Sequence, residues 1–221
     1  MKKRLVIVGG KGSGQIAMSV FEAVNELNQE WKIEGFLNDI VNVGEYFGKY
    51  KVVGTTDEIT DFANIGYYIH YTLHFNAINK YARVNKFKSL NIPLEANATA
   101  IHPKAYINPE TKIGNGVLIL PNVSTSFSPK IGNFVHVYAG AFIGHDSVIH
   151  DYATVAAHAV VGARINVNEG AHIGLNACIK EDINIGKYSV IGMGSVVIRD
   201  TEDFSIVVGN PAKRVGYLEN Q

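Results

Sequence analysis

The sequence is poor in cysteine, with a single residue, Cys178, in a chain of 221. One thiol cannot form an intrachain disulfide, and it excludes a zinc site built from several cysteines of one chain. A lone cysteine in such a sequence is most often a small apolar residue of the interior, so we expect Cys178 to be buried. A chain of this length can bury a sizeable core, and its stability must come from that core.

Net charge is also missing, because 20 Lys and Arg balance 20 Asp and Glu. No basic stripe is visible that would neutralise a phosphate backbone, so the sequence predicts no nucleic-acid partner.

Long apolar runs are absent as well. The start, "MKKRLVIVGG", is basic and then apolar. Its short apolar run ends in glycines, which favours a first buried strand over a secretory signal. No run reaches the ~18 apolar residues that a membrane-spanning helix needs. We therefore expect a soluble, cytoplasmic protein with no membrane partner.

What the sequence does contain is a repeat with a period of six residues. From Ile101 onward every sixth residue is a β-branched aliphatic, with Thr125 as the one exception: Ile101, Ile107, Ile113, Ile119, Thr125, Ile131, Val137, Ile143, Ile149, Val155, Val161, Val167, Ile173, Ile179, Ile185, Ile191 and Val197. A period sustained over about a hundred residues indicates short strands stacked as a solenoid.

The residue after each aliphatic is often glycine or asparagine. These residues are Asn108, Gly114, Gly132, Gly144, Gly162, Asn168, Gly174, Gly186 and Gly192. Both types tolerate a positive φ, so we predict left-handed corners at these positions. His150 occupies the same slot, and we predict the same corner role for it.

Three six-residue strands per turn make a coil of eighteen residues, which predicts a triangular prism with coils about 4.8 Å apart. Residues eighteen apart should then stack along one edge. His136, Thr154 and His172 have this spacing, and we predict that they form a ladder on the surface. His158 is interpreted as an exposed residue of the scaffold.

Before Ile101 the pattern changes to alternating strands and helices. Strands are predicted at "RLVIVGG", "WKIEGFLND" and "GYYIHYTL", and helices at "QIAMSVFEAVNEL" and "NAINKYARVNKFKSL". This alternation favours a small, parallel, Rossmann-like α/β domain. We divide the chain into residues 1–96, an α/β nucleotide-sugar-binding domain, and residues 97–221, the solenoid with its C-terminal tail.

A glycine-rich loop follows the first predicted strand. In "VIVGGKGSGQIA" the residues Gly10, Gly12 and Gly14 have G-x-G-x-G spacing, which departs from the G-x-G-x-x-G of dinucleotide-binding loops. Asn38 and Asp39, at the end of "GFLND", should lie beside this loop and accept hydrogen bonds from a ribose or base. Because the domain is small, we prefer a nucleotide sugar to a dinucleotide. A tight turn without any ligand remains the alternative.

The repeat, the glycine loop, "GFLND" and the tail "VVGNPAKRV" together resemble the sugar acetyltransferases of the PglD and NeuD type, which belong to the hexapeptide-repeat acyltransferases. The resemblance covers essentially the whole chain. It implies a left-handed parallel β-helix after the α/β domain, acetyl-CoA as co-substrate, no metal, and a homotrimer with active sites between neighbouring chains.

The resemblance assigns the general base to His145 and its acidic partner to Asp146, in the stretch "IGHDSVI". The chemistry agrees, since imidazole accepts a proton near neutral pH while an amine attacks a thioester. Adjacent residues of a strand point to opposite faces, so the two side chains can meet only if they lie at a corner.

The resemblance also assigns residues to the co-substrate and the nucleotide sugar. Ala163 lies eighteen residues after His145, and its backbone N–H is expected to bind the thioester carbonyl or the oxyanion. Thr154 stands where relatives commonly have a histidine near the thioester, and Lys213 and Arg214 are expected to pair with coenzyme A phosphates. Gly10, Gly12 and Ser13 should contact the nucleotide sugar, although relatives often have a histidine within this loop, at a place where this chain has Ser13.

The sequence therefore predicts an acetyl-CoA-dependent N-acetyltransferase that acts on a nucleotide-linked amino-deoxysugar, with a UDP-linked 4-amino-4,6-dideoxy sugar as the favoured substrate. Its product would enter glycan or lipopolysaccharide assembly. One alternative is O-acetylation of a sialic acid-type sugar, in which the same base would deprotonate a hydroxyl. Another is a non-catalytic solenoid that only binds nucleotide sugars.

Overall fold

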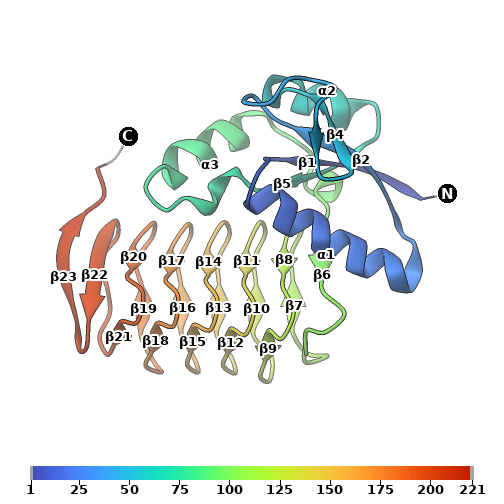
Figure 1. The fold of residues 1–221 in the computed structure, drawn as a ribbon. Coiled ribbons are helices and arrows are strands. Elements are labelled where there is room, and N and C mark those ends of the chain that lie inside the picture. Colours follow the sequence, from blue (N-terminus) through green and yellow to red (C-terminus); the bar gives the residue numbers. More distant parts are fainter. Residues whose placement is uncertain (1, 220–221) are drawn as a thin grey trace.

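The computed structural model describes residues 2–219 and consists of an α/β domain mounted on one face of a triangular β-helix (Figure 1). The α/β sheet has the order β3-β4-β2-β1-β5. Its strands are β1 (Lys3–Val8), β2 (Trp31–Leu37), β3 (Tyr46–Phe47), β4 (Tyr50–Gly54) and β5 (Tyr68–Tyr71). β1, β2, β4 and β5 run parallel, and β3 and β4 form an antiparallel hairpin. No helix within residues 2–219 is both long and apolar enough to cross a membrane.

The helices of this domain are α1 (Ser13–Asn28), α2 (Ile59–Asn64) and α3 (Lys80–Ser89), together with the short 3-10 turns η1 (Thr56–Glu58), η2 (Leu73–Phe75) and η3 (Leu94–Ala96). α1 and α3 lie against the β-helix (Figure 1). Because η3 ends just before the first strand of the β-helix, we keep residues 1–96 and 97–221 as the proposed division of the chain.

The β-helix has three faces, which we name by what covers or lines them. The covered face lies under the α/β domain and comprises β6 (Ala100–Ile101), β8 (Leu118–Ile119), β11 (His136–Val137), β14 (Thr154–Val155), β17 (His172–Ile173), β20 (Val190–Ile191), β22 (Ser205–Gly209) and the antiparallel β23 (Ala212–Tyr217). The apolar face comprises β9 (Ser124–Thr125), β12 (Phe142–Ile143), β15 (Val160–Val161), β18 (Cys178–Ile179) and β21 (Val196–Val197). The polar face comprises β7 (Lys112–Ile113), β10 (Lys130–Ile131), β13 (Val148–Ile149), β16 (Asn166–Val167) and β19 (Asn184–Ile185).

The second residue of each two-residue strand of the β-helix is the repeated aliphatic, or Thr125 in β9, and it points into the prism. Most of these side chains are fully buried and form one continuous core, with the small residues at the other inward positions. Each strand pairs in parallel with the strand eighteen residues away, as Phe142 does with Val160. The six-residue period is thus the packing repeat of the core, as the sequence predicts.

The left-handed corners lie two residues later than predicted. Positive φ occurs at the third residue after the aliphatic, as at Asp146 (φ 56°) and His158 (φ 58°), and not at Gly144 or His150. The predicted corner role of His150 is therefore wrong, and His158, which is exposed as expected, has that conformation. The glycine slot has a different cause, because a Cβ on Gly144 would come within 2.7 Å of the Ala163 nitrogen of the next coil.

These corner residues form three columns with different chemistry. One column, between the covered and apolar faces, contains Asn122, Gly140, His158, Asn176 and Gly194. The column between the polar and covered faces is largely aromatic, with Phe134 stacked on Tyr152, and α3 packs against it. The third column separates the apolar and polar faces and contains Ser128, Asp146, Arg164 and Asp182. We call this third column the polar edge.

Two burial predictions are wrong for the same reason. The repeat does not show which face of the β-helix the α/β domain covers. Cys178 is exposed, because it is the outward residue of β18 on the uncovered apolar face. His136 and Thr154 do stack with His172 as predicted, but they are fully buried beneath the α/β domain and do not form a surface ladder.

Candidate active site

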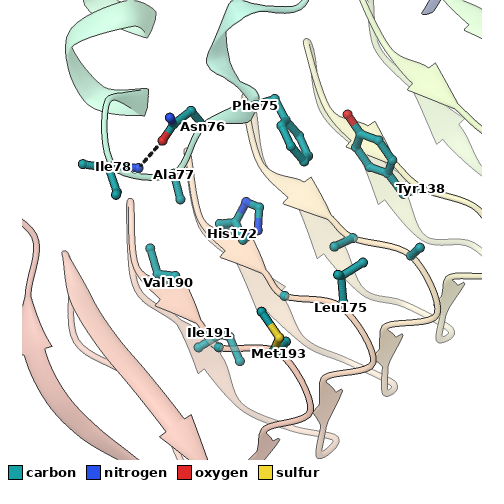
Figure 2. Close-up of a pocket in the computed structure, with 14 residues that line it drawn as sticks. Phe75, Asn76, Ala77, Ile78, Tyr138, His172, Leu175, Val190, Ile191 and Met193 are labelled. Carbon is teal, nitrogen blue, oxygen red and sulfur yellow. Dashed lines mark hydrogen bonds between the residues drawn. The ribbon is translucent and has the colours of Figure 1, made fainter. Parts of the chain in front are cut away.

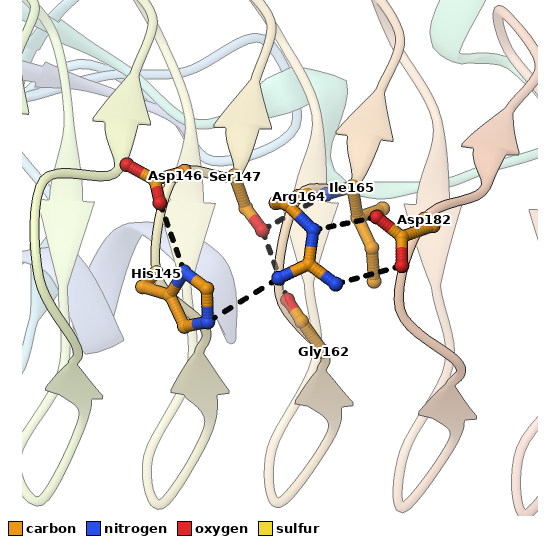
Figure 3. A network of polar contacts seen from close by, with 7 residues as sticks. All are labelled: His145, Asp146, Ser147, Gly162, Arg164, Ile165 and Asp182. Carbon is orange, nitrogen blue, oxygen red and sulfur yellow. Dashed lines mark hydrogen bonds and ion pairs between the residues drawn. The ribbon is translucent and has the colours of Figure 1, made fainter.

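His145 and Asp146 lie at the polar edge, and their side chains contact each other. The left-handed conformation of Asp146 turns its carboxylate back toward the preceding ring, so that His145 Nδ1 and Asp146 Oδ2 are 2.9 Å apart (Figure 3). This corner is the arrangement that the pair requires. Because a carboxylate only accepts hydrogen bonds, the contact assigns a proton to Nδ1 and leaves Nε2 with a free lone pair in the neutral ring. Both side chains are about half exposed.

Arg164 and Asp182, which sequence reasoning did not single out, extend this pair along the polar edge. The Arg164 guanidinium donates to both carboxylate oxygens of Asp182, with Nε–Oδ1 at 2.6 Å and Nη2–Oδ2 at 2.7 Å. Its Nη1 lies 3.5 Å from His145 Nε2 (Figure 3). Hydrogen bonding to Arg164 holds the pKa of the Asp182 carboxyl below its usual range. The signal was present in the sequence as Asp146, Arg164 and Asp182 at a spacing of eighteen residues.

The Ala163 amide lies one coil beyond His145. The flanking amides are occupied, since Gly162 N–H donates to Ile179 O and Arg164 N–H donates to His145 O. Within residues 2–219 the Ala163 N–H donates no hydrogen bond to another backbone group. Gly144 packs closely against this part of the next coil, since a Cβ there would come within 2.7 Å of the Ala163 nitrogen. A donor without a partner near a base is suited to an oxygen that gains negative charge.

The glycine loop and "GFLND" do come together at the start of α1. Asn38 Nδ2 donates to Gly9 O, and Asn38 Oδ1 accepts from the amides of Ile40 and Val41. The Asp39 carboxylate accepts from the amide and hydroxyl of Thr56 at 2.7 Å each. In this structure the two side chains therefore shape the loops around the predicted site, and their contact with a nucleotide stays a prediction.

The loop itself leaves space for a ligand. Gly12 has φ 89°, and a Cβ added there would have no atom within 4 Å. A Cβ added at Gly10, in contrast, would lie only 2.6 Å from Asn38 Nδ2. The Ser13 hydroxyl contacts the Thr72 hydroxyl at 3.2 Å. A cavity of about 210 Å³ adjoins Asp39 and is lined also by Tyr71 and Arg83.

Thr154, which the resemblance places near the thioester of coenzyme A, is buried in the structure. Its side chain has no exposed surface, and its hydroxyl accepts a hydrogen bond from Lys80 Nζ at 2.8 Å. Lys80 comes from α3 and is itself buried, and desolvation lowers its pKa to about 7. A hydroxyl enclosed in this way offers no contact to coenzyme A, so the prediction for Thr154 is not supported.

A group of buried histidines surrounds this lysine at the junction of the two domains. His70 and His74 come from the α/β domain, and His136 and His172 from the covered face. The His74 and His136 rings are 4.3 Å apart, and both nitrogens of His136 lack a hydrogen-bond partner within residues 2–219. Desolvation lowers the pKa of His70 to about 4 and that of His172 to about 3. Within residues 2–219, no group of three or more His, Cys, Asp or Glu side chains is arranged so that it could hold a metal ion.

The C-terminal candidates lie on an exposed strand. Lys213 and Arg214 belong to β23, and both are exposed. Arg214 is already engaged, because its Nη1 lies 2.6 Å from Glu202 and its guanidinium is stacked over Tyr217. Lys213 is therefore the freer of the two cations for a phosphate, and both assignments stay predictions.

An apolar pocket of about 510 Å³ lies at the edge between the covered and apolar faces (Figure 2). Leu175 and Met193 form its outer wall, with 47% and 76% of their surface exposed. Phe75 and Tyr138 lie toward the α/β domain, and His172 lies at the floor. The apolar face thus has His145 along one edge and this pocket along the other.

The comparisons with known proteins agree with this architecture. Residues 128–163 match the family described as bacterial transferase hexapeptide (six repeats). No curated protein sequence gives a significant match.

Solved structures match over nearly the whole chain. The acetyltransferase domain of PglB from Neisseria gonorrhoeae superposes with a TM-score of 0.83 at 22% identity, covering 97% of this chain and 100% of that chain. A histidine-to-asparagine variant of perosamine N-acetyltransferase from Caulobacter crescentus gives 0.82 at 22% identity, with 96% of each chain covered. WeeI from Acinetobacter baumannii gives 0.80 at 24% identity, with 97% and 100% covered. At these identities the likeness establishes a shared fold, and it confirms the predicted α/β domain followed by a left-handed β-helix.

Proposed function

We propose that this protein is an acetyl-CoA-dependent N-acetyltransferase that acts on the amino group of a nucleotide-linked amino-deoxysugar. The observation that carries the proposal is the group at the polar edge. Asp146 accepts from Nδ1 of His145 and so leaves the Nε2 lone pair free. This histidine lies one coil from the Ala163 N–H, which has no backbone partner within residues 2–219. The fold comparisons support it, because the matching structures include the PglB domain with acetyl coenzyme A and the perosamine enzyme with CoA and GDP-perosamine.

The proposed reaction is a direct transfer of the acetyl group. The sugar amine attacks the thioester carbonyl carbon, and His145 Nε2 takes a proton from the amine as the C–N bond forms. Asp146 stabilises the imidazolium from the opposite side of the ring, and the Ala163 N–H donates to the carbonyl oxygen as its charge grows. The C–S bond then breaks, the amide is formed, and the thiolate of coenzyme A receives the proton from His145.

The nucleotide end of the substrate is proposed to bind at the N-terminus of α1. The loop is open at Gly12, where we propose that the pyrophosphate lies, with Gly10 and Ser13 as further proposed contacts. A helix N-terminus favours negative charge. Asn38 and Asp39 hold the loops that border this space. We propose a UDP-linked 4-amino-4,6-dideoxy sugar as the first substrate to test, with GDP and dTDP sugars alongside it.

The coenzyme is proposed to bind along the edge between the covered and apolar faces, toward the C-terminal tail. The apolar pocket with Leu175 and Met193 suits a pantetheine arm, since it offers mostly apolar walls and few polar groups. Lys213 and Arg214 are the proposed contacts of the coenzyme A phosphates. No role is proposed for the Thr154 side chain, which is buried.

We further propose that the protein is a homotrimer that assembles through the apolar face. Phe142, Val160 and Cys178 project outward from this face and are exposed in the single chain, whereas the polar face carries lysine and asparagine at the matching positions. Packing such faces together would bring the His145 edge of one chain toward the pocket of its neighbour. Light scattering is expected to give three times the chain mass, and a Val160→Glu variant is expected to dissociate. A wild-type monomer at micromolar concentration would contradict the assembly.

The proposed activity is tested directly by turnover. Purified protein, acetyl-CoA and a nucleotide-linked 4-amino sugar are expected to release free CoA thiol and an N-acetylated product. The matched 4-hydroxy sugar separates this reaction from O-acetylation, which would instead acetylate the hydroxyl. Binding of the nucleotide sugar without binding of acetyl-CoA would favour the non-catalytic alternative. Absence of turnover across UDP, dTDP and GDP amino sugars would reject the proposed function.

A further inference from the structure

Arg164 makes a second contact with the ring of His145, in addition to the contact from Asp146. The guanidinium lies beside Nε2, on the side of the ring opposite Asp146 (Figure 3). Guanidinium has donors only, so any hydrogen bond between Arg164 and the ring requires Nε2 to be the acceptor. Asp146 requires the proton to be on Nδ1 for the same reason. Both neighbours therefore favour the same tautomer of His145.

The guanidinium is held in position from two directions. The Arg164 backbone amide donates to His145 O at 2.9 Å, and Asp182 accepts from the guanidinium Nε and Nη2 in a bidentate pair. A bidentate pair fixes the plane and direction of a guanidinium in a way that a single contact does not. Only Nη1 is left to face the imidazole. The distance of 3.5 Å is at the long end for a hydrogen bond, so the contact can yield to a substrate amine.

We propose that Arg164, anchored by Asp182, is a positioning residue that keeps His145 in the Nδ1-protonated form and caps the Nε2 lone pair until the amine replaces it. The inference rests on the proposed function, in which Nε2 is the proton acceptor. The charged groups near the guanidinium are Asp146, Glu181 and Asp182, and Lys180 lies near Asp182.

The decisive variant is Arg164→Gln, which keeps a side chain of similar reach but removes the charge and the bidentate pair. We expect kcat to fall by about 10-fold to 100-fold, because the ring is no longer held in the reactive form. The KM values for acetyl-CoA and the amino sugar should stay within about twofold. Arg164→Lys should restore part of kcat, and Asp182→Asn should give an intermediate loss.

A second measurement is independent of turnover. In protein labelled with ¹⁵N-histidine, the His145 signals, assigned by their loss in His145→Asn, should report a protonated Nδ1 and an unprotonated Nε2 above neutral pH. In Arg164→Gln the two tautomers should become mixed. Lys112→Gln, which removes an exposed cation from the polar face, is the matched control and should change neither readout.

The outcomes separate this inference from the proposed function. If Arg164→Gln retains kcat and the His145 tautomer, the positioning role is wrong even though the enzyme acetylates its sugar. A rise in KM with an unchanged kcat would also overturn it, because Arg164 would then be a substrate contact. If wild-type protein shows no turnover, the proposed function fails, while the ¹⁵N spectra still decide whether Arg164 sets the tautomer.

Discussion

Replacing His145 by asparagine is expected to lower kcat by about 100-fold or more, with KM values within about threefold of wild type. The amide cannot accept the amine proton at neutral pH, but it leaves the corner, the Ala163 N–H and the core untouched. A 100-fold loss corresponds to about 2.7 kcal/mol of transition-state stabilisation. The measurement is steady-state release of CoA thiol with an amino sugar as acceptor.

The control for this substitution is another exposed histidine of the β-helix. His150→Asn changes a residue outside the proposed site, so its kcat should match wild type. Asp146→Asn should be less damaging than His145→Asn, because the base remains but loses its acidic partner. If His145→Asn retains a rate within about threefold of wild type, the proton acceptor is another group.

Mild acid is expected to destabilise the fold strongly, because the histidines between the domains cannot take up protons. The pKa values of His70 and His172 fall to about 4 and about 3, and those of His74 and His136 lie well below 6.5, all chiefly through desolvation. Below pH 6.5 the unfolded chain binds protons that the folded chain does not, so stability declines as pH falls through this window. At pH 5.5 each of these four histidines is expected to contribute a loss on the order of 1 kcal/mol, and the four together a loss of several kcal/mol.

Thermal unfolding followed by circular dichroism tests this expectation. The midpoint should fall by about 10 to 20 °C between pH 7.5 and pH 5.5 for a chain of this size. His136→Leu removes a ring that makes no hydrogen bond, so this variant should lose about a quarter less stability on acidification. His150→Asn, an exposed control, should keep the full wild-type pH dependence. A midpoint that is independent of pH over this range would show that the cluster opens to water in solution.

The burial of Lys80 also makes the fold less stable as the pH falls, but over a higher pH range. Its pKa of about 7 lies below the ordinary 10.5, so the unfolded chain again binds the proton that the folded chain excludes. The resulting penalty is complete below pH 7 and is relieved as the pH rises from 7 toward 10.5. The buried hydrogen bonds to Thr154 and Tyr152 O offset part of the desolvation of this amine.

The sequence was sufficient for the features that depend on period. Residues eighteen apart do stack, as Thr154 does between His136 and His172. The Ala163 nitrogen does lie one coil from the His145 backbone. These follow because one inward position of every six-residue unit is filled by a β-branched aliphatic. Function assignments carried by the resemblance, such as those of Lys213 and Arg214, stay predictions.

The features that sequence reasoning missed depend on contacts between coils or domains. A glycine such as Gly144 suggests a left-handed corner, but it is required by the backbone of the next coil, and the corner falls at Asp146. The burial of Thr154 is decided by Lys80, which is far away in the sequence and belongs to the other domain. Arg164 was overlooked because its own coil makes it an exposed surface residue, and only the coils on either side give it partners.

The corner columns also limit how this chain can change in length during evolution. An insertion or deletion of eighteen residues adds or removes one whole coil and leaves every column aligned. A change of six residues would still place an aliphatic at each core position, yet it would rotate all later residues onto the next edge. Arg164 and Ala163 would then leave the line of His145, while the core stayed filled. Six-residue changes between His145 and Asp182 would therefore keep the core filled but destroy the site, so length variation should be confined to whole coils there.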